Sequence, residues 1–390
     1  MTYLLGIDAS KFKHDCIIAD EYGNALTNPF TIENNRNGFD VLLETLNDFK
    51  SKGEIKIGFE ATGHYTVNLK LFLEASGFSY MELNPLNIKD FIRSKSLRKT
   101  KTDKKDSKWI TLYLGQVDYK PYTKQFYHLY SLKSLTRLRH SLIENRSLYL
   151  VKITNILDHI FPEIKPYFGN KFSSSLLYIL TNYLTPYHIK NMTIESYNNM
   201  ISKLRKPISY QRFMEVKELA RKTVGISNSI LEFELKSLLS LYHSLNEEIS
   251  NIEEEIESHM KIINSKTLTI PGIGIQSASV IVSEIGDFSR FDNPEKLLAF
   301  IGLDPAKYQS GIQDYSGHMV KRGSSNLRYV IMNCAETFYV HNPVISDYYW
   351  KKRSEGKCHR VALSHVARKL VSVIYYLETN NLDFDSSKLR

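Results

Sequence analysis

The chain has 390 residues, 42% of them hydrophobic, and a formal net charge of +9 with a pI near 9.1. One hydrophobic core rarely grows beyond about 250–300 residues, so this length predicts two or three domains. The basic charge favours a polyanionic partner. The sequence has no uncharged apolar run long enough to span a membrane and no signal-peptide pattern, which predicts a cytoplasmic protein without a membrane partner.

The predicted elements of residues 1–120 alternate between strands and helices. The predicted strands are 3–8, 15–19, 25–32, 55–60 and 79–83, with a turn at Gly23-Asn24. The predicted helices are 38–50, 64–75, one that begins at Pro85, and 104–114. Three meandering strands followed by strand–helix units predict a ribonuclease-H-like α/β domain over residues 1–120.

Four carboxylates are placed in this domain with the spacing of a split metal site. Asp8 and Glu60 each end an apolar strand run, whereas Asp103 and Asp106 are three residues apart and so share a helix face. Such an oxygen cage suits Mg²⁺, with Mn²⁺ as an alternative. Two ions held about 4 Å apart would clamp the attacking and leaving oxygens of a phosphodiester displacement. The pattern therefore predicts nuclease-like chemistry.

Basic residues surround the second pair of acids. They are Arg93, Lys95, Arg98, Lys99, Lys101, Lys104, Lys105 and Lys108. A basic stretch around two acids suits a site where a metal and a polyanion meet, so these residues are candidates for nucleic-acid binding. The alternative is a solvated, lysine-rich loop in which the Asp residues are incidental.

Residues 125–262 give almost entirely helical signals. An apolar heptad-like stripe runs from Leu135 to Ile160, and a cleaner one runs from Leu231 to Ile256 with acidic residues at outer positions. This spacing predicts a coiled coil and favours a homo-oligomer. Residues 165–225 between the two stripes predict small helices without a motif that indicates function.

The segment 265–390 predicts a helical C-terminal domain. Gly272 and Gly274 fit a helix–hairpin–helix signature, in which glycines let backbone N–H groups approach a phosphate. The alternative is an ordinary Pro-Gly connection between helices. Lys321, Arg322 and Arg328 are further candidates for phosphate contacts, with a solvated helix start as their alternative. The last helix is expected at about 361–377.

Several short motifs occur in a fixed order along the chain. The N-terminal ones are Gly6-Ile7-Asp8-Ala9-Ser10, Gly58-Phe59-Glu60-Ala61-Thr62-Gly63 and Lys101-Thr102-Asp103-Lys104-Lys105-Asp106. The C-terminal ones are Pro271-Gly272-Ile273-Gly274, Gly302-Leu303-Asp304-Pro305, Ser310-Gly311 in a predicted loop, and 321–328. Together they resemble the DEDD insertion-sequence transposases (the "one-ten" group), which include the Piv-type DNA invertases. The resemblance covers about residues 1–115 and 265–340.

This resemblance implies a RuvC-type resolvase fold in which Asp8, Glu60, Asp103 and Asp106 bind Mg²⁺. It also implies a nucleophilic serine in the C-terminal domain, carried over to Ser310. The family excises and inserts its element through strand exchange between donor and target double-stranded DNA. It further implies a structured guide RNA that pairs with both DNAs (a bridge RNA), a dimer that becomes a tetramer in the synaptic complex, and sites that combine acids and serine from different subunits.

The residues alone do not single out the nucleophile. Ser310, Ser316, Ser324 and Ser325 all lie in the relevant stretch, and nucleophiles are recognised by geometry and not by position. The resemblance favours Ser310. His14 and His64 near the acids are expected to be structural, hydrogen-bonded residues and are left out of the metal set.

Three cysteines, Cys16, Cys334 and Cys358, lie far apart and lack CxxC spacing. They are expected to be reduced, buried thiols, without a disulfide frame or a zinc site.

Two other functions compete with a guided transposase. One is a metal-dependent endonuclease of the Holliday-junction resolvase type, whose C-terminal domain only binds DNA. The other is a nonenzymatic nucleic-acid scaffold with a decayed nuclease fold, which the intact acids disfavour. In the transposase interpretation a phosphoserine link would conserve the energy of the broken phosphodiester, so strand joining is expected to need no ATP. The lack of a GxxxxGK[ST] phosphate loop in the sequence is consistent with that expectation.

Overall fold

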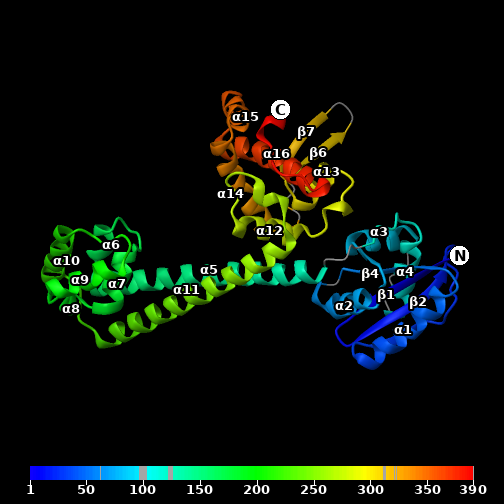
Figure 1. The fold of residues 1–390 in the computed structure, drawn as a ribbon, viewed down its shortest axis with the longest axis horizontal. Helices are drawn as coiled ribbons and strands as arrows, with labels where there is room; N and C mark the ends of the chain where they lie inside the picture. Colours follow the sequence, from blue (N-terminus) through cyan, green and yellow to red (C-terminus); the bar gives the residue numbers. More distant parts are fainter. Residues whose placement is uncertain are drawn as a thin grey trace. The chain divides into compact units, whose positions relative to one another are not determined.

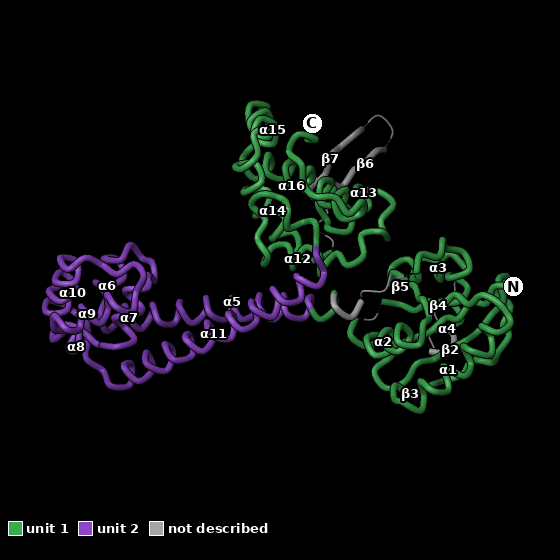
Figure 2. Tube along the Cα trace, viewed as in Figure 1, with its two compact units in different colours: residues 1–131, 265–390 green, residues 132–264 purple. Residues whose placement is uncertain are grey.

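A computed structural model describes the backbone of residues 1–61, 63–95, 103–121, 126–310, 313–319, 321 and 323–389. It describes their side chains except those of 103–105, 126–128, 305–310 and 313–318. The chain divides into two compact units, one made of residues 1–131 and 265–390 and the other of residues 132–264 (Figure 2). Within the described ranges, no helix is long and apolar enough to cross a membrane.

The N-terminal part is built on a five-stranded mixed sheet (Figure 1). Its strands are β1 (Thr2–Ala9), β2 (Lys13–Asp20), β3 (Phe30–Glu33), β4 (Glu54–Glu60) and β5 (Tyr80–Leu83). Their order in the sheet is β3-β2-β1-β4-β5. The first three strands pair antiparallel, and β1, β4 and β5 pair parallel, so the carboxyl ends of these last three strands lie at one edge.

Helices cover both faces of this sheet. They are α1 (Arg36–Lys50), η1 (Gly63–Thr66), α2 (Val67–Ala75), α3 (Pro85–Lys95) and α4 (Asp103–Leu114). Helices α1 and α2 bury Leu42 and Leu69 against a core that contains Leu5 and Ile7 of β1. Helices α3 and α4 pack on the opposite face, in a core that contains Leu4. Because side chains alternate between the two faces of a strand, a separate hydrophobic core forms on each face of the sheet.

Two glycines let α4 lie directly on the strand backbones. Gly6 of β1 and Gly58 of β4 are register partners. A Cβ at Gly6 would lie 2.1 Å from Thr111 Oγ1 and 2.7 Å from the Ser107 carbonyl oxygen, and one at Gly58 would lie 2.8 Å from Leu114 Cδ1. Because no glycine side chain lies between α4 and the two strands, the helix packs directly on the backbones of β1 and β4.

Most N-terminal elements form where the sequence predicts them, but the third strand does not. It was expected over 25–32 and forms only at Phe30–Glu33, with a single bridge between Ala25 and Ala19. Thr27 Oγ1 accepts a hydrogen bond from Ile18 N, which removes that donor from the ladder. Pro29 has no N–H to offer. Both residues delay the start of the strand.

The second unit consists of two long helices and a group of short ones between them. Its helices are α5 (Phe126–Ile160), α6 (Ile164–Tyr167), α7 (Ser174–Tyr183), α8 (Pro186–Lys190), α9 (Ile194–Lys203), α10 (Tyr210–Lys222) and α11 (Ser229–Ile263). Arg139 Nε donates to Glu253 Oε1 at 2.7 Å, and Arg146 Nη1 donates to Asn246 Oδ1 at 2.9 Å. These two links run in opposite directions along the chain, so α5 and α11 are antiparallel.

The apolar stripe predicted on α11 is buried or half-buried along its length. On α5, by contrast, Leu138 is 49% exposed, and the next residue, Arg139, faces α11 instead. Coiled-coil geometry for the pair stays a prediction. The short helices expected over 165–225 are present as α6 to α10.

The C-terminal part is mainly helical, with one two-stranded sheet. Its elements are η2 (Lys266–Thr269), α12 (Ile275–Ile285), η3 (Phe288–Arg290), α13 (Pro294–Ile301), β6 (Pro305–Ser310), β7 (Gln313–Met319), α14 (Ser325–His341), α15 (Pro343–Ser354), α16 (His359–Asn380) and η4 (Ser386–Lys388). Helix α14 packs against α12, α15 and α16. Glu378 of α16 accepts hydrogen bonds from Thr267 N and Oγ1, at 2.8 and 2.6 Å, which fixes η2 to this core.

The cysteines are free, as expected, but one is not buried. Cys16 and Cys334 lie in the cores, whereas Cys358 is exposed at the position that precedes α16. The expectation of burial was wrong for Cys358 because it lies in the short connection between α15 and α16 and faces no core.

Gly6→Ala should lower the free energy of unfolding by about 3 kcal/mol, because the added methyl meets backbone and side-chain atoms of α4. Thermal or denaturant unfolding measures the change. Gly274→Ala is the matched control, since its φ of −83° suits any residue and a Cβ there meets nothing within 4 Å. Equal stability of the two variants would contradict the close packing at Gly6.

Candidate active site

Two of the predicted acids lie side by side on one face of the sheet. Along β1, Tyr3, Leu5 and Ile7 face α1 and α2, so Asp8 faces α4. The same alternation on β4 directs Phe59 to the α1 side and Glu60 to the α4 side. Ile7 and Phe59 are register partners in the parallel pair, and Asp8 and Glu60 follow them. Both acids are half-buried.

The other two predicted acids lie at the start of α4. The helix begins at Asp103, and Asp106 is half-buried immediately before Ser107, whose carbonyl lies against Gly6. The contact at Gly6 therefore places the first turn of α4 beside the strand ends that carry Asp8 and Glu60. The side chain of Asp103 lies outside the description. Among the side chains that the structure describes, no group of three His, Cys, Asp or Glu residues is arranged to hold a metal.

A fifth acid, Asp15, lies next to this group and was not predicted from the sequence. It is the register partner of Asp8 in the antiparallel pair of β1 and β2, so the two side chains share the α4 face. Asp15 is 3% exposed. Its carboxylate accepts a hydrogen bond from Thr31 Oγ1 and forms an ion pair with Lys13 Nζ at 3.4 Å. Only the strand register, which sequence spacing does not give, could have revealed it.

The histidines near the acid motifs belong elsewhere. His14 pairs with Ala9 and so lies on the opposite face, fully buried, with its ring stacked on Phe39 at 6.0 Å between centroids. Burial lowers the pKa of His14, which keeps the imidazole neutral. His64 is exposed in η1 and lies against the Tyr65 ring. Neither ring nitrogen of His14 has a hydrogen-bond partner in the described part of the chain, so the expectation of a hydrogen-bonded residue was wrong for His14. The exclusion of both histidines from the metal set stays a prediction.

Cys16 lies on the same face of the sheet as His14, the face covered by α1 and α2, because it is the register partner of Ile7. Burial raises the pKa of its thiol well above the usual range, and the charges of Asp15 and Asp8 raise it further. The thiol therefore stays protonated.

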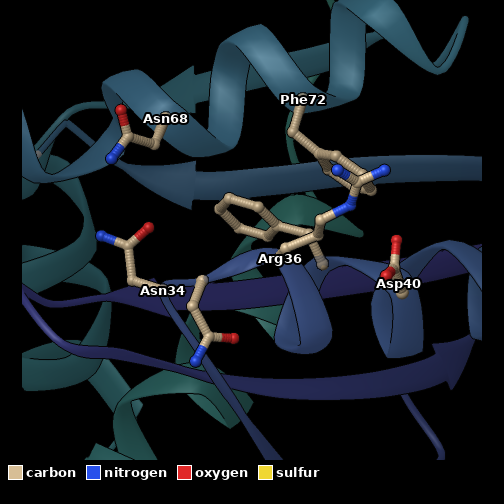
Figure 3. A pocket seen from close by; sticks show the side chains of 7 residues that line it. Asn34, Arg36, Asp40, Asn68 and Phe72 are labelled. Carbon is tan, nitrogen blue, oxygen red and sulfur yellow. The ribbon is translucent and has the colours of Figure 1, made fainter.

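A hollow also lies on the α1 and α2 side, and Figure 3 shows the side chains that line it. Its volume is about 480 Å³. Its lining includes Asn34, Arg36 and Asn68, together with the stacked rings of Phe39 and Phe72, whose centroids are 4.7 Å apart. Because the sheet separates this hollow from Asp8 and Glu60, it is not part of the carboxylate site.

The structure describes only some of the basic residues that were predicted to bind nucleic acid. Arg93 and Lys95 end α3 and are exposed, and Lys108 is exposed on α4. Arg93 Nη1 lies 3.6 Å from Asp90 Oδ1, an exposed pair that leaves the guanidinium open to solvent. Arg98, Lys99 and Lys101 lie outside the described residues, as do the side chains of Lys104 and Lys105.

The candidate serines occupy different structural positions. Ser310 was expected in a loop but is the last residue of β6, paired with Gln313 of β7. Ser324 precedes α14, and its hydroxyl accepts the Leu327 N–H at 3.2 Å as an N-cap. Ser325 is the exposed first residue of that helix. The side chains of Ser310 and Ser316 lie outside the description.

Two of the remaining residues predicted to contact nucleic acid, Gly272 and Arg328, form hydrogen bonds within the fold. Gly272 has a φ of +87°, and its carbonyl accepts a hydrogen bond from Thr337 Oγ1 at 3.1 Å, so the turn is held against α14. Arg328 Nη1 donates to the carbonyls of Ile301 and Gly323, at 3.1 and 3.2 Å, and holds the loop before α14.

Lys321 is exposed with a left-handed φ of +52°, and Gly274 is exposed at the start of α12. Arg322 lies outside the described residues. The element directly before the Gly272 turn is the short 3₁₀ helix η2 and not an α-helix, so the helix–hairpin–helix motif stays a prediction.

Two family models match this chain. One, described as "Transposase", matches residues 5–162, and one described as "Transposase IS116/IS110/IS902 family" matches residues 264–350. The chain belongs to the IS110/IS116 family of transposases. All four predicted acids of the transposase fall within the first match, and Ser310 falls within the second.

Individual relatives agree with this assignment. The "Insertion element IS116 uncharacterized 44.8 kDa protein" of Streptomyces clavuligerus is 24% identical over 95% of this chain and 93% of its own length. The "Transposase for insertion sequence element IS1328" of Yersinia enterocolitica is 33% identical over 25% of this chain and 30% of its own. The "Pilin gene-inverting protein" of Moraxella bovis is 28% identical over 30% of this chain and 37% of its own. The transposase is thus similar both to insertion-element proteins and to an inverting protein.

The buried His14 should make the stability of this transposase depend on pH. Its pKa is lowered from 6.5 in the folded protein, so the unfolded chain binds more protons as the pH falls below 6.5. Stability is then complete above that pH and is lost as the pH falls towards the folded pKa. His14→Phe keeps the stack on Phe39 without the titration. Urea unfolding at pH 7.5 and pH 5.5 should show a smaller loss for the variant, and an equal loss would contradict this role.

Proposed function

We propose that this transposase cleaves and exchanges DNA strands at a Mg²⁺-dependent site made by Asp8, Glu60, Asp103 and Asp106. The observation that carries the proposal is the packing of α4 on Gly6 and Gly58, which brings its first turn to the strand ends that carry Asp8 and Glu60. The sheet order, with three antiparallel strands joined to two parallel ones, supports a RuvC-like, ribonuclease-H-like fold.

The donor set suits a hard divalent cation. Asp8, Glu60 and Asp106 offer only carboxylate oxygens, and the nearby thiol of Cys16 lies on the other face of the sheet. These acids together with Asp103 would hold Mg²⁺ or Mn²⁺, which supplies Lewis-acid stabilisation of charge on the phosphoryl oxygens. Asp15 is the register partner of Asp8, and the half-exposed Lys13 at 3.4 Å offsets only part of its charge, so its carboxylate would add negative potential beside Asp8.

We propose Ser310 as the nucleophile. Its hydroxyl oxygen would form a bond to phosphorus while the bond to a deoxyribose oxygen breaks. The hydroxyl proton would pass to a neighbouring base or water, and the departing sugar oxygen would take up a proton. The phosphoserine ester conserves the energy of the broken phosphodiester, so a second sugar hydroxyl can displace the serine without nucleotide hydrolysis.

The partners proposed for this chemistry are donor and target double-stranded DNA and a structured bridge RNA. Base pairing by such an RNA would leave the protein to recognise backbone, duplex shape and 2′-hydroxyls. The formal charge of +9 and the exposed Arg93, Lys95 and Lys108 support contact with polyanions. The proposal also includes assembly into a dimer and a synaptic tetramer, in which acids and serine would come from different subunits.

The serine is tested by trapping a covalent protein–DNA adduct on labelled element-end DNA. Ser310→Ala should abolish the adduct, because no other hydroxyl would occupy its place. Ser325→Ala is the matched control and should retain the adduct, since this exposed serine only begins α14. Strand exchange by Ser310→Ala at the parent rate would rule the serine out. Cleavage by Ser310→Ala without exchange would favour the resolvase-type endonuclease instead.

The acids are tested by calorimetric titration of the free protein with Mn²⁺, alongside DNA cleavage. Asp8→Asn and Glu60→Gln should lose detectable Mn²⁺ binding and cleavage, whereas Asp15→Asn should weaken binding severalfold through loss of a nearby negative charge. Asp48→Asn, an exposed acid on α1 paired with Lys52, should change neither. Unchanged binding and cleavage in Asp8→Asn would refute the proposed metal site.

A further inference from the structure

The short helices between α5 and α11 carry much of the charge of this protein. Residues 161–228 contain ten Lys and Arg against four Glu and no Asp, an excess of six positive charges in a chain with a net charge of +9. This segment lies almost wholly between the two family matches, and neither of them assigns it a role. We call residues 161–228 the helical insert.

Some of these cations have structural roles. Glu218 forms ion pairs with Arg221 and Lys222, at 3.3 and 3.0 Å. Arg212 lies over the ring of Tyr167, at 5.1 Å from its centroid. Lys217 donates to the Met192 carbonyl. The positive charge of these side chains is therefore partly balanced or held within the fold.

Four other cations are exposed and are not paired with a carboxylate in the described part of the chain. They are Lys171, Lys203, Arg205 and Lys206. Lys171 lies three residues before Ser174, the first residue of α7, and the other three lie at the connection from α9 to α10. Ser175 Oγ lies 3.5 Å from the Lys206 carbonyl, so that connection lies against the start of α7. The four cations thus gather around one end of α7.

A hollow of about 320 Å³ opens next to these cations. Its lining includes Tyr178 and Thr181 of α7, Tyr242, His243 and Asn246 of α11, and Leu204. Leu204 stands between Lys203 and Arg205 in the sequence, and Ser174 also lines the hollow. The hollow therefore extends from the basic residues between α9 and α10 to the surface between α7 and α11.

The lining has the chemistry of a base-binding site. It offers aromatic rings, hydroxyls, amides and an imidazole, but no carboxylate, lysine or arginine. Burial raises the pKa of Tyr178, so its phenol stays protonated as a hydrogen-bond donor. The lining is also well supported, because His243 Nε2 and Thr181 Oγ1 are 2.8 Å apart and Asn246 is held by Arg146. Neutral polar groups beside aromatic rings suit an uncharged planar group that makes hydrogen bonds.

We propose that the helical insert binds an unpaired nucleotide of single-stranded nucleic acid, with the base in this hollow and neighbouring phosphates on Lys171, Lys203, Arg205 and Lys206. Single strands are bound in this way, by stacking on aromatic side chains and by cations that follow the backbone. The proposal rests on the proposed function, since it assumes a polynucleotide partner. It adds a second site, separate from the acids, that recognises unpaired bases.

An acidic polypeptide would also suit the four cations. It is disfavoured by the hollow, because Asp and Glu side chains are charged and have no aromatic ring to place against the lining that contains Tyr178 and Tyr242. A duplex is disfavoured because its bases are stacked and paired within the helix and cannot enter the hollow.

The local test is photocrosslinking of the full-length protein, without divalent metal, to oligonucleotides with one 5-iodouracil. RNA and DNA single strands form two arms, and the same strands annealed to complements are the control. Crosslinks should map to Tyr178, Tyr242 or His243 with single strands and disappear with duplexes. The arm with the higher yield identifies RNA or DNA as the source of the base. Crosslinks only outside the helical insert, or equal yields with duplexes, would overturn the proposal.

The charges are tested by anisotropy titrations with labelled single strands at several salt concentrations. Arg205→Gln/Lys206→Gln should lower the slope of log K against log salt by about 1.4, since each lost phosphate contact contributes about 0.7 on single strands. Arg221→Gln/Lys222→Gln is the matched control, because both of these side chains already pair with Glu218, which offsets part of their charge, and the slope of this variant should fall less. Equal slopes for the two variants, or competition by polyglutamate as effective as by oligonucleotide, would refute nucleotide binding here.

Failure of this proposal is distinguishable from failure of the proposed function. Crosslinking and salt dependence need neither the acids nor Ser310. A Ser310→Ala variant that still forms the adduct would leave the insert site intact, and absent crosslinks would leave the proposed strand exchange intact.

Discussion

The position of the first turn of α4 depends on the absence of two side chains. Gly6 and Gly58 are neighbours across the parallel pair of β1 and β4, and together they form a flat patch of backbone on which α4 lies. The Ser107 carbonyl and Thr111 are in contact with this patch. Because a helix is rigid over two turns, contact at these residues fixes where its first residues are. The acids of α4 are therefore placed by packing, because Asp106 directly precedes the contacting Ser107 and Asp103 lies about one turn before it.

The two faces of the sheet separate groups of different chemistry. Asp8, Glu60 and Asp15 face α4, whereas His14 and Cys16 face α1 and α2. Strand alternation alone produces this separation, since neighbours along a strand point to opposite faces. The consequence is a donor set of oxygens on one side and neutral, buried side chains on the other. A one-residue change of register would mix the two groups, so the register of β1 and β2 matters as much as the identity of the acids.

The sequence predicts much of this arrangement, and its failures have physical causes. Asp8 and Glu60 could be recognised because each ends an apolar run, and the ends of parallel strands meet at one edge. Asp15 could not, because its place beside Asp8 follows from the pairing of two strands and not from spacing. The late start of β3 depends on one hydrogen bond, from Ile18 N to Thr27 Oγ1, that periodicity does not contain. Cys358 is exposed because the chain turns there, a detail of the connection between two helices.

Charge is distributed unevenly along the chain, and this limits how a polyanion can be bound. The helical insert alone has an excess of six positive charges, while α11 carries Glu253, Glu254, Glu255 and Glu257 near its end. At physiological salt, charges further apart than about 8 Å on a surface are largely screened. The total of +9 therefore does not act as one field. Attraction must arise in separate basic patches, each close to its own phosphates, and a chain built in this way suits more than one strand of nucleic acid at a time.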